Sequence, residues 1–489
     1  MKRFILNSVS FAALMIAAPA MAQNVQQAAN AQDAVLSGNA GTAITQNGND
    51  NTAKVDQGTN SGLRAYVQQD GSNNTGTVDQ KSASSAVSRV TQGQNPGRGN
   101  SSSNIATTIQ GGAGADSTVL QSGDGKNNVI VKQSGRSTSR IDQKGGANSA
   151  NVSQTGEGND SGIVQTGSAN RAGTDENVGV TQSGSYNVSA VNQFNTGNMV
   201  EVMQTGTGNN SLVTQNGSGN STDIGGIGIE QSGDYHTSTV TQNGDGGVVR
   251  VQQFNQGTLG GNESTITQTA NGITSVKQSG DNTLRVNQDA SRLAYNPKIA
   301  GSPSNAMVWV EQIGANEAKV TQQAAASGSD ASVYQSGSAN NAEITQIAGW
   351  NDAGDEWNAR GTGGIDQTGN NNTAKNTQTG ANYADVTQSS AYNTAEVTQT
   401  GNGTATVIQS GSYGQAFVNQ NSGQQIALVT QSGVGNFADV EQYGAGPNTA
   451  NITQNASYGV AMINQDGVGN NATINQGVSS GALTALTGK

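Results

Sequence analysis

The stretch AITQNGNDNTAKVDQ, residues 43–57, contains the pattern that decides the fold. Its two glutamines, Gln46 and Gln57, are eleven residues apart, and each follows a branched apolar residue by two positions. Residues at i and i+2 lie on the same face of a strand, so each apolar residue and its Gln point the same way. Between the glutamines stand Gly48 and Asn51, which accept positive φ and predict a tight reversal. The stretch therefore predicts a strand, a turn and a second strand.

The same unit recurs along nearly the whole chain. About 36 glutamines stand in this register, most often eleven residues apart, and Val or Ile precedes each by two positions except at Thr108 and Asn376. The units that repeat the Gln, Gly, Asn, small residue and Gln pattern most fully contain Gln46, Gly48, Asn51, Ala53 and Gln57; Gln143, Asn148 and Gln154; Gln182, Asn187 and Gln193; Gln204, Asn209 and Gln215; Gln335, Asn340 and Gln346; Gln431, Asn436 and Gln442; and Gln465, Asn470 and Gln476.

Recurrence of the same polar residues favours stacked strands over the hairpins of an up-and-down barrel. A hairpin meander needs only apolar and polar alternation, whereas identical amides recur when each bonds the amide of the next layer. That bond would satisfy a buried polar group that otherwise costs a few kcal/mol. We therefore predict an all-β fold, a β-solenoid with two strands per rung of about 22 residues and about 18 rungs stacked at about 4.8 Å. We expect Gln193 and Gln204 to point inward, and Asn192 and Met203 to point outward.

Five insertions interrupt the repeats, and they follow Gln92, Gln165, Gln215, Gln288 and Gln346. They lie near residues 93–109, 166–180, 216–228, 289–307 and 347–364. All five follow odd-numbered strands when strands are counted from Gln46. With two strands per rung, we expect the insertions to leave the same edge of the solenoid.

Composition excludes most other classes. The 489 residues include 68 Gly, one His and no Cys, and the formal net charge is −11. Aromatic residues make up 4% and charged residues 11%, so a thick globular core is not available. The lack of Cys excludes a disulfide scaffold, a zinc ribbon and a thiol nucleophile, and the acidic balance argues against nucleic-acid binding. We expect no cofactor and no metal.

The first segment has the features of a secretory signal peptide. Lys2 and Arg3 precede a short apolar run, and the sequence AMA ends at Ala22. This predicts a signal peptide over residues 1–22, cleaved between Ala22 and Gln23, and a secreted mature protein. The apolar run is shorter than the ~20 residues that span a bilayer, so we expect no membrane insertion.

The repeat resembles the curlin repeat of curli-type functional amyloid fibres in bacterial biofilms. The resemblance covers residues 44–477 and rests on Gln, Gly, Asn, Ala or Ser, and Gln at fixed offsets, in an expanded, many-repeat form. It implies an extracellular fimbrium, self-association, and other curlin subunits and host or abiotic surfaces as partners. It also implies export by a curli-type outer-membrane secretion apparatus, with residues 23–43 as targeting segment and residues 478–489 as a C-terminal tail.

No catalytic residue is predicted. His236 lies in SGDYHTST and reads as an exposed turn residue. Five tyrosines four positions after a register Gln read as decoration of exposed arcs rather than as a carbohydrate platform: Tyr186, Tyr235, Tyr392, Tyr413 and Tyr458. Acidic residues next to register glutamines are expected to point outward and to be scattered: Asp56, Asp79, Asp142, Glu230, Glu311 and Glu441.

Three alternatives to a fibre subunit remain. An autotransporter-like adhesin would need a C-terminal membrane barrel, which the tail GALTALTGK does not suggest. A carboxylate-dependent, polysaccharide-cleaving β-helix would need paired carboxylates. Ice binding would need a flat, Thr-rich face. For a fibre subunit, we expect the strands that end at Gln465 and Gln476 to form a growth surface without a cap, because few residues follow them.

Overall fold

The computed structural model describes residues 24–27, 34–35, 41–93, 101–123, 125–173, 179–222, 228–255, 260–289, 307–323, 329–348, 352–353, 364–477 and 483–488. These residues form strands, turns and bridges, and none of them is helical. The chain divides into two compact units, Met1–Tyr235 and His236–Lys489. The predicted signal peptide, with Ala22 and Gln23, lies outside the described residues.

The first unit contains the strands β1 (Asn24–Gln27), β2 (Ala34–Val35), β3 (Gly41–Asn47), β4 (Thr52–Gln57), β5 (Arg64–Ser72), β6 (Thr75–Gln80), β7 (Val87–Gln92), β8 (Ser101–Ser102), β9 (Ile105–Gln110), β10 (Asp116–Ser122), β11 (Asn128–Ser134), β12 (Thr138–Gly146), β13 (Ser149–Glu157), β14 (Asp160–Ser168), β15 (Arg171–Ala172), β16 (Val180–Ser185), β17 (Val188–Thr196), β18 (Met199–Val200), β19 (Val202–Thr207), β20 (Asn210–Gln215) and β21 (Ile229–Ser232).

The second unit contains β22 (Thr237–Gln242), β23 (Val248–Phe254), β24 (Glu263–Gln268), β25 (Ile273–Gly280), β26 (Thr283–Gln288), β27 (Met307–Gln322), β28 (Asp330–Ala348), β29 (Asp352–Ala353), β30 (Gly364–Asn370), β31 (Thr373–Gly380), β32 (Tyr383–Gln388), β33 (Thr394–Gly401), β34 (Thr404–Gln409), β35 (Gln415–Asn421), β36 (Gln425–Gln431), β37 (Phe437–Tyr443), β38 (Asn448–Gln454), β39 (Val460–Gln465), β40 (Asn471–Gln476) and β41 (Leu483–Gly488).

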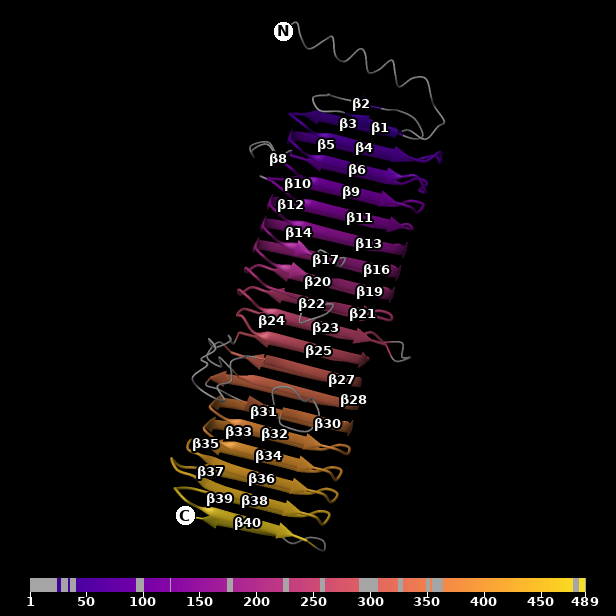
Figure 1. Cartoon of the computed structure of the whole chain (residues 1–489). Helices are drawn as coiled ribbons and strands as arrows, with labels where there is room; N and C mark the ends of the chain where they lie inside the picture. Colours follow the sequence, from indigo (N-terminus) through magenta and orange to yellow (C-terminus); the bar gives the residue numbers. More distant parts are fainter. Residues whose placement is uncertain are drawn as a thin grey trace. The chain divides into compact units, whose positions relative to one another are not determined.

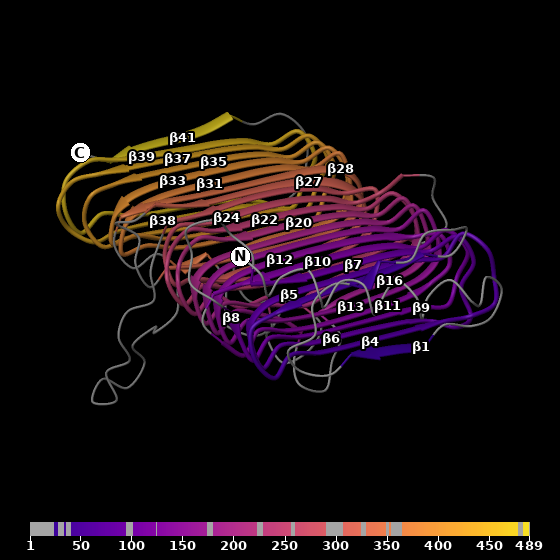
Figure 2. The same cartoon turned by 90° about the horizontal axis from the view of Figure 1, so that it is seen from above.

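Within each unit most strands pair in parallel with the strand one rung away rather than with the next strand in sequence. The long strands β27 and β28 each run through both sheets and pair with each other. In the first unit β4 pairs with β6 and β5 with β7, so the strands form two stacked sheets (Figures 1 and 2). The register aligns like with like: Val55 stands opposite Val78 and Gln57 opposite Gln80. The β-solenoid prediction is confirmed, with about 16 turns against the about 18 rungs expected.

The core is a thin layer between the two sheets. Side chains alternate along each strand, and β6 shows the pattern half-exposed and buried three times in succession. The buried positions hold Val or Ile and Ala or Ser, such as Ile141, Ala150 and Val152. Small and branched side chains let the sheets approach closely, and each Val or Ile removed from water contributes about 1.5–3 kcal/mol.

Gly48, two residues after Gln46, cannot be replaced by a larger residue, because of its backbone conformation and because the next rung lies too close. Gly48 has a φ of 115°, which L side chains rarely adopt. A Cβ on Gly48 would lie 1.9 Å from the carbonyl oxygen of Gly71 in the next rung. Gly145 repeats this arrangement with Gly167, so the Gly of the motif permits the arcs to stack at the spacing of the strands.

The two exceptions to the Val or Ile rule differ. Thr108 is buried, but its hydroxyl lies 2.7 Å from the hydroxyl of Ser88. Asn376 is also fully buried, and neither its amide oxygen nor its amide nitrogen has a hydrogen-bond partner. Ile344 and Val397 are its register partners in the neighbouring rungs, so Asn376 interrupts an apolar column.

Replacing Asn376 by Val should therefore stabilise the second unit. The change removes two buried polar atoms without partners, each of which costs about 1–3 kcal/mol, and it restores the apolar column. We expect a higher urea midpoint of unfolding, while the outward change Thr377→Val leaves it almost unaltered. A lower midpoint for Asn376→Val would show that the Asn amide is satisfied in solution.

Both ends of the described chain carry strands that the repeat pattern does not include. At the N-terminal end, β1 pairs antiparallel with β4 and β2 pairs antiparallel with β3, whereas the repeats pair in parallel. At the other end, β41 continues the parallel stack on β39. The tail therefore extends one sheet beyond the last repeat, and the segment before Ala43 covers part of the first rung.

The long insertions follow glutamines of one sheet in each unit. Gln92, Gln165 and Gln215 belong to a single ladder in the first unit. Gln288 and Gln346 share a ladder in the second unit. The first insertion is shorter than the sequence indicated, because β9 begins at Ile105.

Candidate functional site: the stacked amides and the terminal strands

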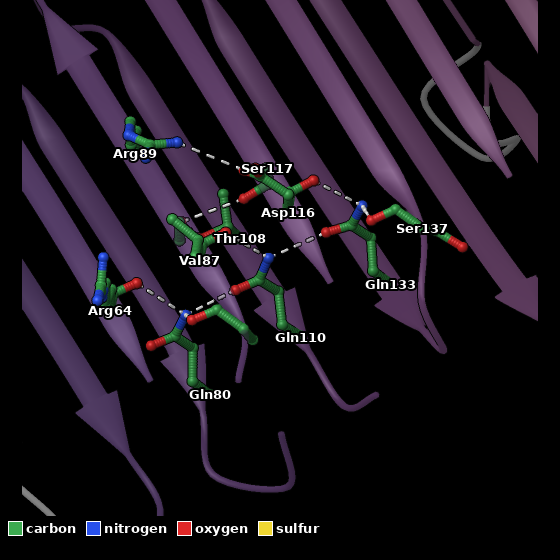
Figure 3. Close-up of polar contacts among 12 residues, drawn as sticks. Arg64, Gln80, Val87, Arg89, Thr108, Gln110, Asp116, Ser117, Gln133 and Ser137 are labelled. Carbon is green, nitrogen blue, oxygen red and sulfur yellow. Dashed lines mark hydrogen bonds and ion pairs between the residues drawn. The ribbon is translucent and has the colours of Figure 1, made fainter. Parts of the chain in front are cut away.

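The register glutamines form continuous hydrogen-bonded ladders. In the sheet that contains β4, the amide nitrogen of Gln57 donates to the amide oxygen of Gln80 at 2.8 Å, and Gln80 donates to Gln110 at 2.7 Å. Gln110 donates to Gln133 at 3.0 Å, and Figure 3 shows this part of the ladder. The ladder glutamines are buried almost completely. Their stacking satisfies polar groups that would otherwise be costly inside the solenoid.

The glutamines predicted from the sequence take part in these contacts, each with the glutamine of the next rung in its own sheet. The pairs are Gln46 with Gln69, Gln143 with Gln165, Gln154 with Gln182, Gln182 with Gln204, Gln193 with Gln215, Gln204 with Gln231, Gln335 with Gln367, Gln346 with Gln378, Gln431 with Gln454, and Gln442 with Gln465.

Most ladder amides make a second bond that joins the two sheets. The nitrogen of Gln110 also donates to the carbonyl oxygen of Val87 at 2.8 Å, and that of Gln133 donates to Asp116 at 3.0 Å. Val87 and Asp116 are the first described residues of β7 and β10, in the opposite sheet. Gln110 and Gln133 therefore use both amide hydrogens, one along the stack and one across the core. The repeat spacing alone did not indicate this cross-sheet bond.

The ladders have one direction. In the first unit the nitrogen belongs to the glutamine nearer the N-terminus and the oxygen to the glutamine one rung later. The second unit repeats this direction from Gln242 to Gln465 and from Gln253 to Gln476. A ladder with one direction ends in an acceptor at its N-terminal rung and in a donor at its C-terminal rung.

The Asn of the motif forms a second column, in the arcs. The amide oxygen of Asn51 accepts the backbone N–H of Asn74 at 3.0 Å, and its nitrogen donates to the carbonyl of Gly71. Asn148 repeats both bonds with Asn170 and Gly167. Each arc is thus hydrogen-bonded to the arc of the next rung. Further members of such columns are Asn187, Asn209, Asn340, Asn436 and Asn470.

His236 occupies a position in this column, and the sequence prediction of an exposed turn residue is wrong. Its side chain is fully buried, and its Nδ1 accepts the backbone N–H of Asn262 at 3.0 Å. The Nδ1 of His236 thus plays the part that an Asn amide oxygen plays elsewhere in the column. In the next rung, for example, the amide oxygen of Asn262 accepts the backbone N–H of Asn282. The position five residues after Gln231 could have revealed this, because Asn stands there in the complete units.

The first rung leaves its end of a ladder open. The amide oxygen of Gln46 is buried and has no hydrogen-bond partner among the residues that the structure describes. Gln57 differs, because its amide oxygen accepts the hydroxyl of Thr42 at 2.8 Å. Strands β1 and β2 therefore cover backbone edges of the first rung without supplying Gln46 with a donor.

The last rung is open in a different way. Gln465 donates to the carbonyl of Thr449, but its register partner in β41 is Gly488, which has no amide side chain. Strand β40 pairs with β38, and among the described residues no strand pairs with its other edge. Ala472 and Gln476 are half-buried, although their counterparts in the rungs before are buried. The uncovered edge is thus β40, while β39 is covered by β41.

The acidic residues next to register glutamines lie on six different strands. Asp56 is buried, and Lys81 lies 2.5 Å from its carboxylate. The hydrogen bond to this carboxylate raises the pKa of Lys81. Among the described residues, no group of three His, Cys, Asp or Glu side chains could hold a metal ion. In the same residues, no helix has the length and apolarity to cross a membrane.

The surroundings of the Asp385 carboxyl disfavour its ionised form. Burial, and secondly the charge of Asp366, raise the pKa of Asp385 to about 6. A raised pKa means that the folded state favours the neutral form. The cost of ionisation is therefore absent below about pH 4 and complete above about pH 6, so stability falls between these values as pH rises.

Asp385→Asn should consequently stabilise the second unit at neutral pH and not at about pH 4. A shift of about two units corresponds to about 3 kcal/mol, which solvent screening reduces to about 1–2 kcal/mol. Urea unfolding at the two pH values measures the difference. Asp366→Asn should lower the pKa of Asp385 and give a smaller gain. An equal effect of Asp385→Asn at both pH values would contradict the assignment.

Each of the five tyrosines lies in an arc, four residues after a register glutamine. Within each unit these glutamines belong to strands of a single sheet, and they are Gln182, Gln231, Gln388, Gln409 and Gln454. All five have a φ between 57° and 61°, and all are at least half exposed. They are thus on exposed arcs, at a left-handed position of the turn.

Comparison with known proteins gives one match. The model of a family described as the curlin associated repeat matches residues 196–225. No curated protein matches the chain. The matched segment includes Gln204, Asn209 and Gln215, whose ladder and arc bonds are those of the units around it. The matched segment shares its geometry with the units around it, so the chain contains a curlin associated repeat.

Proposed function

We propose that the chain is a secreted structural subunit of curli-like amyloid fibres in the extracellular biofilm matrix. In this proposal it has no enzymatic role and mediates surface adhesion and aggregation. Fibres grow by templated addition, in which the terminal rung of one copy receives the first rung of the next. The curlin repeat supports an extracellular or cell-surface location and self-association.

The observation that carries the proposal is the complementarity of the two ends. The first rung has a buried acceptor without a donor at Gln46, and the last has a ladder donor without an amide acceptor at Gln465. A second copy stacked with the same direction would join donor to acceptor and continue the ladder. Strands β1, β2 and β41 cover parts of these ends, so their displacement would belong to the joining step.

Lateral contacts are held in check by the outward residues. Lys277 pairs with Glu311, and Lys319 with Glu343, on strands of the second unit. Charged side chains on exposed strands oppose unspecific edge and face contacts. Addition at the ends is then favoured over disordered association.

Export belongs to the same proposal. Residues 1–22 would direct the chain out of the cytoplasm, and residues 23–43 would be recognised by a curli-type outer-membrane secretion apparatus. Since β1 and β2 lie within the second segment, this segment would act first in export and later at the first rung. Other curlin subunits and host or abiotic surfaces are the proposed partners outside the cell.

Assembly of the mature chain tests the function. Purified protein that begins at Gln23 is expected to form fibres after a lag, and short fibre fragments are expected to abolish the lag. A monomer that persists for days at high concentration, with and without fragments, would refute the proposal. The persistent monomer would favour the adhesin, which needs the same solenoid but no polymerisation.

A further inference from the structure

One pair of exposed tyrosines differs from the other tyrosines of the arcs. The rings of Tyr392 and Tyr413 stack with centroids 4.9 Å apart and planes within 1° of parallel. They belong to arcs that follow β32 and β34, which pair in parallel and in register. No other ring pair among the described residues is stacked in this way; Phe417 and Phe437 are tilted by 44°.

The backbone holds the two rings in position. Both residues have a φ of 59°, and the N–H of Tyr413 donates to the carbonyl of Ala391 in the arc before it. The N–H of Tyr392 donates in the same way to Asn370. The backbone of each arc is thus fixed to the next, which keeps the two tyrosines one rung apart.

Three of the other tyrosines have a glycine, not a second tyrosine, at the matching position of the preceding rung. A Cβ on Gly158 would lie 2.5 Å from Tyr186, one on Gly208 would lie 2.9 Å from Tyr235, and one on Gly435 would lie 2.8 Å from Tyr458. These three rings lie over a glycine of the preceding rung instead of over another phenol. They serve as matched controls, because they share conformation and exposure with the pair.

We propose that Tyr392 and Tyr413 form an oxidative cross-linking site, at which a one-electron oxidant joins the two phenols as dityrosine. Both side chains are about half exposed, at 50% and 56%, so an oxidant in solution reaches them. Two reactive groups held in contact react as if at a very high local concentration. The site needs only peroxide and a haem peroxidase as the source of oxidation.

The reaction balances as follows. Each phenol loses one electron and one proton to give a phenoxyl radical. The two radicals pair to form one carbon–carbon bond between ring carbons ortho to the oxygens, and the two ortho hydrogens then move to the oxygens through solvent to restore both phenols. One hydrogen peroxide takes up two electrons and two protons and becomes two water molecules.

The product would join two consecutive rungs by a covalent bond within one chain. A cross-link between positions 392 and 413 restricts the unfolded chain and so stabilises the folded one, as a disulfide does. This inference does not depend on fibre formation, because both residues belong to the same copy.

The test treats the full mature chain, as dilute monomer, with hydrogen peroxide and a haem peroxidase. Peptide mass spectrometry should find a linked pair from positions 392 and 413, with a yield at least about tenfold above any other intramolecular pair. Tyr392→Phe and Tyr413→Phe should each abolish the linked peptide, while Tyr186→Phe leaves it unchanged. Unfolding in urea before oxidation should reduce the yield to that of the other tyrosines, and the cross-linked chain should unfold at a higher urea concentration than the untreated one.

Two results would overturn the proposal. One is a yield of linked peptides containing Tyr186, Tyr235 or Tyr458 that equals the yield of the pair 392 and 413 in the folded chain. This would show that exposure alone controls coupling. The other is oxidation of the folded chain, detected by peroxide consumption, with no peptide that links positions 392 and 413.

Discussion

Replacement of Gln204 by Leu is expected to destabilise the first unit by about 2–6 kcal/mol, because two amide groups lose their partner at about 1–3 kcal/mol each. Gln204 accepts from Gln182 at 2.8 Å and donates to Gln231 at 2.8 Å. It also donates to the carbonyl of Val188 in the opposite sheet. Leu preserves the volume but leaves the donor of Gln182 and the acceptor of Gln231 buried. Urea unfolding measures the loss, and the rate of assembly should fall with it.

Met203→Ser is the matched control. Met203 precedes Gln204 in the same strand and is half-buried on the outer face. Its replacement removes apolar contact but no ladder bond, so we expect a change within about 1 kcal/mol. Gln193→Leu and Asn192→Ser form a second such pair in the other sheet. Equal destabilisation by inward and outward changes would contradict the role of the ladder.

Thr473→Pro is expected to slow fibre growth at least about tenfold while the monomer keeps its stability, because proline removes one donor from an open edge. The carbonyl of Asn470 accepts from Thr449 in β38 at 2.8 Å, and that of Gln476 accepts from Asn455, the residue after β38, at 2.9 Å. In a parallel ladder alternate residues point their peptide groups to opposite sides. The N–H of Thr473 therefore points away from β38, toward an incoming strand. Elongation from preformed fragments measures the effect.

Thr473→Ser keeps this N–H and should elongate like the unchanged chain. Ile474→Pro is a poor test of growth, because the N–H of residue 474 points toward β38 and its loss would damage the last rung itself. Unaltered elongation by Thr473→Pro, with an unchanged monomer, would show that the edge of β40 is not the template.

The sequence was sufficient to predict the ladder because its pattern is a direct consequence of stacking. A buried amide needs a hydrogen-bond partner, and in the ladder that partner is another amide, so Gln57 and Gln80 are the same residue type at the same register position. Gly48 is likewise fixed by the carbonyl of Gly71. These constraints repeat in each rung, so the sequence shows them many times.

Features that occur once were not predictable in this way. His236 reads as a turn residue because only the column position, and not the residue type, shows its burial. The burial of Asp56 was not predicted, because Lys81, which lies over it, stands 25 positions later in the sequence. Strand β41 has Gly488 in place of the register Gln, so the repeat pattern ends before the fold does.

Diffraction from aligned fibres of the mature chain tests the central claim most directly. If copies join end to end and continue both ladders, strands lie across the fibre and give a strong reflection at about 4.8 Å along the fibre axis. Thr473→Pro should then yield few fibres, with the same reflection in those that form. Fibres without this reflection, or with it perpendicular to the axis, would contradict growth by stacking of rungs.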